Sequence, residues 1–96
     1  MSDSFNQDNE INVKGLVRRF ERMISDDSNS FFDAEDFELI IDYYLDHHKL
    51  VKCQRAIDTA IEQHPASISF SIKQAKVYLL SDQPAKALDL LSNIEE

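Results

Sequence analysis

The apolar residues of this chain recur at helical spacing in five stretches that are separated by short polar breaks. In the first stretch, Val13, Val17 and Phe20 follow one another at intervals of four and three residues, which places them on one face of a helix. The same kind of spacing predicts helices over residues 12–25, 31–47, 50–63, 68–80 and 84–94. The pattern therefore predicts an all-α fold.

The breaks between these stretches carry residues that begin or end helices. Ser30, three residues before Asp33, is a candidate N-cap for the second helix. Pro65 disfavours helical geometry at His64 and so ends the third helix. Ser67 can cap the fourth helix in the same way as Ser30.

The chain divides into three parts on this basis. Residues 1–11 are polar and are expected to form a disordered tail. Residues 12–30 are expected to form an amphipathic N-terminal capping helix with its loop, and residues 31–96 two helical hairpins, over about 34–67 and 68–96. The single Gly and the two Pro argue against a fold rich in tight β-turns.

The last two pairs of helices share one pattern of residue types at an offset of 34 positions. Four pairs match in this way: Tyr44 with Tyr78, Leu45 with Leu79, Cys53 with Ala87, and Ile57 with Leu91. A period of 34 in a helical chain is typical of stacked helical-hairpin repeats. Such repeats usually present a binding surface rather than an active site.

The residues at this period resemble the tetratricopeptide repeat, whose pattern has a large aromatic, Leu, Tyr, two small residues, Phe and Pro at fixed positions. The positions that carry the resemblance are Phe37, Ile40, Tyr44, Cys53, Ile57, Ala60 and Pro65 in the first copy, and Ala75, Tyr78, Ala87 and Leu91 in the second. The resemblance covers about residues 34–96. It implies antiparallel hairpins stacked as a right-handed superhelix, with the 12–25 helix added in front.

Several residues depart from that pattern. Ile41 stands at a small-residue position, Ser71 at an aromatic position and Gln74 at a Leu position. His48 and Asp82 replace the usual Gly of the turn between paired helices. A non-repeating five-helix bundle is the alternative fold.

In the fifth helix, Ala87, Leu88, Leu91 and Ile94 are expected to face inward. With two repeats, the chain resembles the N-terminal piece of a longer array, or a protomer that completes its core by self-association. The apolar residues of the last hairpin, among them Leu79, Leu80 and Leu90, predict a homo-oligomer when the chain is isolated.

Four acids, Glu35, Glu38, Asp42 and Asp46, are spaced so that they share one face of the second helix. The resemblance implies that this face lines the concave groove, together with Ile72, Lys73, Lys76 and Leu80 of the fourth helix. These eight residues are the candidate peptide-binding residues, and the acids favour a basic ligand. The alternative is an acidic face that only contacts solvent. Lys73 and Lys76 alone do not support the carboxylate grip that some members of the family use.

Charge and cysteine content narrow the classes of function. The net charge of −8 argues against nucleic-acid and anionic-membrane partners, which need a basic field. The single cysteine, Cys53, forms no intrachain disulfide, and no secretory signal or membrane-spanning run is evident, so a cytoplasmic location is expected. Cys53 is expected to be buried between helices and inert.

No catalytic or cofactor motif is present in the sequence. His47 and His48 are adjacent and point about 100° apart on a helix, so neither they nor His64 predict a metal site. No glycine-rich phosphate loop or nucleophile–base pattern occurs, so no enzyme activity, cofactor or metal is expected. The expected function is a scaffold that binds a protein or peptide in its groove. A small acidic secretion chaperone and a self-assembly domain of a larger repeat protein are the alternatives.

Overall fold

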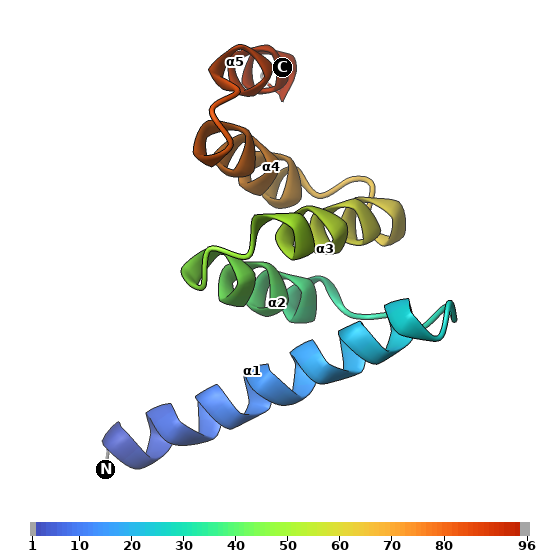
Figure 1. Cartoon of the computed structure of the whole chain (residues 1–96), viewed down its shortest axis with the longest axis vertical. Coiled ribbons are helices and arrows are strands. Elements are labelled where there is room, and N and C mark those ends of the chain that lie inside the picture. Colours follow the sequence, from blue (N-terminus) through green and yellow to red (C-terminus); the bar gives the residue numbers. More distant parts are fainter. Residues whose placement is uncertain (1, 95–96) are drawn as a thin grey trace.

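The computed structural model describes the backbone of residues 2–94 and the side chains of residues 12–94. Within these residues the chain forms five helices and no strand: α1 (Ser2–Ser25), α2 (Ala34–Asp46), α3 (Leu50–Gln63), α4 (Ile68–Leu80) and α5 (Pro84–Ile94). Each helix packs on the next, and α2 also touches α4. Figure 1 shows them following one another along the long axis of the molecule. The predicted all-α fold is confirmed.

The hairpins repeat at the offset that the sequence predicts. α2 and α4 begin at residues 34 and 68, and α3 and α5 begin at residues 50 and 84, so both pairs are 34 residues apart. The bounds of α3, α4 and α5 coincide with the predicted ones, and α1 ends at Ser25 as expected. The right-handed superhelix stays a prediction. α1 begins at Ser2, ten residues before the predicted start at residue 12, so the helix includes residues 2–11, which the sequence predicts as a disordered tail.

The predicted start of the second helix is wrong. α2 begins at Ala34 after Asp33, whose backbone is extended, and not after Ser30. Phe32 is buried in the core, and its N–H donates to Oε1 of Gln63 at 2.9 Å. The Gln63 amide in turn donates to the carbonyl of Ser30 at 2.8 Å. This amide thus ties residues 30–32 to the end of α3 by two hydrogen bonds.

A group of aromatic rings joins four parts of the chain. Phe37 of α2 lies against Phe20 of α1, Phe32 of the loop and Phe70 of α4, with ring centroids 6.2, 5.6 and 6.1 Å away. The ring of His64 lies 5.9 Å from Phe37, at the end of α3. Because α1 contributes Phe20 to this group, it packs on α2 and shares its core.

Two departures from the repeat pattern lie in α4. Ser71, which replaces the expected aromatic, is half-buried, and the preceding residue, Phe70, is fully buried with its ring against those of Phe37 and His64. Gln74 replaces the expected Leu, is 6% exposed, and exchanges amide hydrogen bonds with Gln54 of α3. A buried amide needs such a partner because an unpaired one costs free energy.

The two turns without Gly use the left-handed backbone conformation that Gly would favour. His48 has φ 54° and Asp82 has φ 60°, and Asp27 after α1 has φ 53°. In each turn the next N–H closes back on the helix; Gln83 N, for example, donates to the carbonyl of Tyr78 at 2.8 Å. Asp and His are among the non-Gly residues that tolerate this region best. All three helices therefore end in the same way.

α5 buries fewer of its apolar residues than the sequence predicts. Ala87 is 2% exposed, whereas Leu88 is 70% exposed and Leu91 is 42% exposed. The prediction that Leu88 and Leu91 face inward is therefore wrong. The reason is that, within the described residues, α5 packs only on α4, so only one side of it is covered. Within residues 2–94, none of the helices combines the length and the apolar character needed to cross a membrane.

Candidate interaction surface

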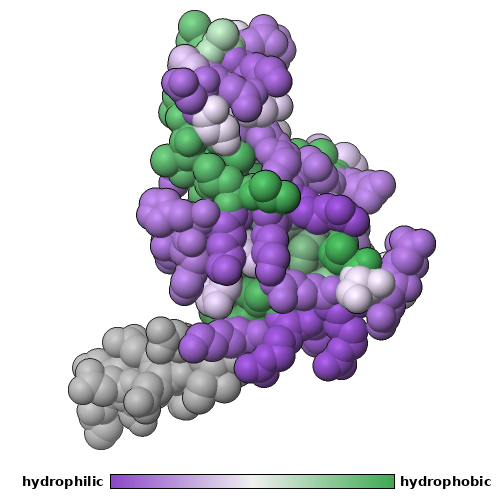
Figure 2. All heavy atoms as spheres, viewed as in Figure 1, coloured by the Kyte–Doolittle hydropathy of each residue, from purple (hydrophilic) through white to green (hydrophobic). Residues whose placement is uncertain are grey.

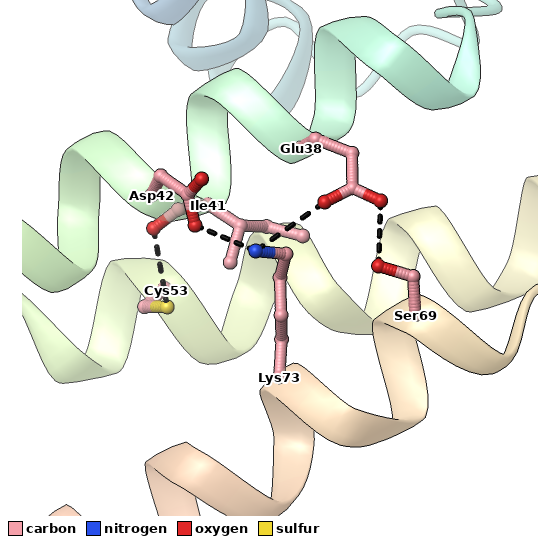
Figure 3. Close-up of polar contacts among 6 residues, drawn as sticks. All are labelled: Glu38, Ile41, Asp42, Cys53, Ser69 and Lys73. Carbon is pink, nitrogen blue, oxygen red and sulfur yellow. Dashed lines mark hydrogen bonds and ion pairs between the residues drawn. The ribbon is translucent and has the colours of Figure 1, made fainter.

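The first helices of the two hairpins are joined by a charged side chain. Lys73 extends from α4 towards α2, and its Nζ lies 2.7 Å from Oδ1 of Asp42 and 3.3 Å from Oε1 of Glu38. One turn earlier in α4, the Ser69 hydroxyl donates to Oε2 of Glu38 at 2.6 Å. Figure 3 shows Lys73 between the two carboxylates. These contacts bring the two predicted halves of the groove side by side.

Lys73 keeps its charge in this position. Burial of its side chain favours the neutral form, but the hydrogen bonds and charges of Asp42 and Glu38 outweigh that effect, so the pKa of Lys73 is raised. The lysine is therefore an ammonium ion at neutral pH and offsets part of the acidic charge on α2. Sequence spacing placed the acids on one face but did not show that a cation from the next hairpin pairs with two of them.

The remaining candidate residues lie on the exposed parts of the same two helices. On α2, Glu35 and Asp46 are exposed at the two ends of the face, and Leu39 is exposed between them. On α4, Lys76 and two apolar residues, Ile72 and Leu80, are exposed and follow Ser69 and Lys73 at helical spacing. The α2 part of this surface is therefore acidic, and the α4 part is apolar and basic. Leu39 was not among the predicted residues, because the face of α2 was defined by the spacing of its acids alone.

A shallow pocket of about 350 Å³ extends this surface towards α1. Val13 and Lys14 of α1 form one wall, and the side chains of Leu39, Asp42, Tyr43, Asp46 and His47 form the rest. The sequence did not assign α1 a part in this surface. The face that the α2 acids share is thus bordered by α4 on one side and by α1 on the other.

Most residues named for repeat packing are buried. Those buried are Phe37, Ile40, Tyr44, Cys53, Ile57, Ala60, Ala75 and Ala87. Tyr78 is half-buried, with the ammonium of Lys86 5.8 Å from its ring centroid. Pro65 is exposed in the turn before α4.

Cys53 is enclosed between helices. Its thiol lies 3.7 Å from the carbonyl oxygen of Ile41 and is fully buried. Burial, with a smaller contribution from the charge of Asp42, raises the pKa of Cys53 to about 11. A thiol that stays protonated and buried is a poor nucleophile.

The three histidines serve the local structure. His47 stacks on Tyr43 at 4.2 Å, and its Nδ1 lies 2.8 Å from the Tyr43 carbonyl oxygen. Nε2 of His64 lies 2.8 Å from the carbonyl oxygen of Phe32. Among the side chains that the structure describes, no three His, Cys, Asp or Glu come together in an arrangement that could hold a metal ion.

Tyr44 links α2 to α1 through a hydrogen bond that the repeat pattern does not predict. Its hydroxyl donates to Oε2 of Glu21 at 2.7 Å, and Lys52 of α3 lies 3.3 Å from the same oxygen. The bond from Tyr44 is the main reason why the pKa of Glu21 is lowered from 4.5, with Lys52 adding to it and burial opposing it. Burial and the Glu21 carboxylate raise the pKa of Tyr44.

Because Tyr44 donates to the Glu21 carboxylate, we expect part of the stability of the fold to be lost in acid. Because the pKa of Glu21 is lower in the folded chain, its contribution is present above pH 4.5 and is lost as the pH falls through the lowered pKa. Tyr44→Phe should cost about 1 kcal/mol of unfolding free energy at pH 7 and reduce the loss of stability that the parent chain shows as the pH falls below 4.5. Urea titrations at several pH values measure this.

The repeat offers a matched control. Tyr78→Phe removes the hydroxyl at the equivalent position of the second hairpin. It should leave the loss of unfolding free energy at low pH nearly unchanged. If Tyr44→Phe and the parent chain lose stability in parallel below pH 5, the bond to Glu21 does not stabilise the fold.

Comparisons with protein-family models, curated proteins and solved structures return no match for this chain. The fold defines the chain as an all-α protein built of repeat-like helical hairpins, with α1 packed against the first of them. Function has to be argued from the surface that these hairpins present.

Proposed function

We propose that this chain is a protein-interaction module that binds a protein or peptide on the exposed face shared by α2 and α4. The observation that carries the proposal is the contact of Lys73 with Glu38 and Asp42, which sets the candidate residues of both helices into one surface. Helical repeats typically use such a shared face for recognition. The resemblance to tetratricopeptide repeats supports the same assignment.

The charges of this face favour a basic partner. Glu38 and Asp42 already hold Lys73, so Glu35 and Asp46 are the acids that a basic ligand would meet first. The exposed Ile72 and Leu80 of α4 add apolar area next to them. A ligand that combines Lys or Arg with apolar side chains therefore fits the surface. The net charge of −8 adds a long-range attraction for such a ligand.

A labelled basic peptide tests the proposal. The probe is a fluorescein-labelled peptide of alternating Lys and Leu, and its Glu–Leu counterpart is the matched negative. We expect saturable anisotropy changes with the basic peptide alone, weakening as salt rises from about 50 to 300 mM. Replacing Glu35 with Gln and Asp46 with Asn should weaken binding about threefold or more.

The control removes the same charge elsewhere. Glu62→Gln with Asp89→Asn neutralises two exposed acids on α3 and α5 and should leave the affinity close to that of the parent chain. Equal weakening by both double variants would mean that the peptide responds only to net charge. That result, or equal binding of the acidic peptide, would refute the proposed site.

A further inference from the structure

The 34-residue offset gives each position of α5 an equivalent on α3. Leu88 corresponds to Gln54, and Leu91 corresponds to Ile57. In the first hairpin these positions are covered: Gln54 exchanges hydrogen bonds with Gln74 of α4, and Ile57 is fully buried. The face of α3 that holds Gln54 is therefore the one on which α4 lies.

Among the residues that the structure describes, no helix covers the equivalent face of α5, and this face is more apolar. Leu88 is 70% exposed and Leu91 is 42% exposed. Leu79, at the end of the adjoining α4, is also exposed. In Figure 2, hydrophobic residues are visible at the tip and along one edge of the α4–α5 end, beside hydrophilic ones. Exposed leucines in such number are unusual for a surface that only contacts water.

We propose that this face of α5 is a docking site for an amphipathic helix of a partner protein, which lies on α5 as α4 lies on α3. The site continues an interface that the chain already contains between its own hairpins. It is separate from the α2–α4 face and does not depend on the function proposed above.

The repeat also fixes one feature of the partner helix. In α4 the residue opposite Gln54 is Gln74, and the two amides satisfy each other. Opposite Leu88 a glutamine would bury its amide without a partner, which costs free energy. The partner helix therefore carries an apolar residue where α4 has Gln74.

A second copy of this chain fits the site less well. The face of α4 that complements such a surface is already buried against α3, with Phe70 and Val77 in the core. Two copies would also bring together two chains that each carry a net charge of −8.

The chain itself supplies the probe. A fluorescein-labelled peptide of residues 67–81 with Gln74→Leu is compared with the unaltered peptide, using the full chain and anisotropy. We expect the Gln74→Leu peptide to bind about fivefold more tightly, since the other peptide leaves one amide unpaired. In the Leu88→Gln chain this preference should reverse or disappear, because an amide partner is restored. Leu88 is exposed, so this variant keeps the fold.

Val51→Gln is the control for general adhesion to apolar residues. Val51 is exposed at the equivalent of residue 85, outside the proposed face, and its replacement should leave the preference unchanged. The same peptide preference in the parent and Leu88→Gln chains would overturn the proposal, as would no saturable binding of either peptide. Light scattering that shows a dimer of the parent and a monomer of Leu88→Gln would assign the face to a second copy and overturn it too.

Discussion

Replacing Phe37 with Ala is expected to lower the free energy of unfolding by about 3–5 kcal/mol. Phe37 is fully buried, and its ring lies within 6.2 Å of the rings of Phe20, Phe32 and Phe70. The substitution therefore opens a cavity where α1, the loop, α2 and α4 meet. A domain of this size is stabilised by about 5–14 kcal/mol in total, so the loss is a large part of it.

Urea denaturation followed by far-ultraviolet circular dichroism measures this effect. Phe31→Ala is the matched control, because Phe31 is 65% exposed and its ring lies beside that of His64, at the edge of the same group. The control should cost less than about 1 kcal/mol. Equal losses from the two variants would show that the aromatic group does not hold the four segments together.

Replacing Ala87 with Trp is expected to destabilise the chain by about 1–3 kcal/mol or more. Ala87 is 2% exposed where α5 packs on α4, and it occupies the position that Cys53 has in the first hairpin. An indole ring at this point forces the two helices apart. Thermal melts should show a drop of several degrees.

The control for Ala87 lies two residues away. Ala85→Trp places the same ring on an exposed position of the same helix and should leave the melting temperature nearly unchanged. An Ala87→Trp chain that melts within one or two degrees of the parent would contradict the packing of α5 on α4.

Helix bounds were predictable where local residues determine them. The ends of α3, α4 and α5 follow from Pro65, from Pro84 and from apolar spacing, and the structure has them at the predicted residues. The start of α2 was not predictable in this way. It depends on Gln63, which is distant in sequence and holds the backbone of Phe32 by a hydrogen bond.

Contacts between the hairpins explain the other differences. The acids of α2 were visible as a stripe, but the position of Lys73 between Glu38 and Asp42 depends on how α4 packs against α2. Leu88 fits the inward stripe of an isolated helix, and its exposure depends on which helices surround α5. The spacing of residues shows which of them share one face of a helix, but it does not show which other helix packs against that face.

A map of backbone amide shifts is the most direct test of the proposed interaction surface. The uniformly ¹⁵N-labelled chain is titrated with the Lys–Leu peptide at low salt. We predict that the largest shifts fall on the exposed α2 and α4 residues, chiefly Glu35, Leu39, Asp46, Ile72 and Lys76. Shifts confined to α3 and α5, or none at millimolar peptide, would contradict the proposal that the α2–α4 face binds a basic partner.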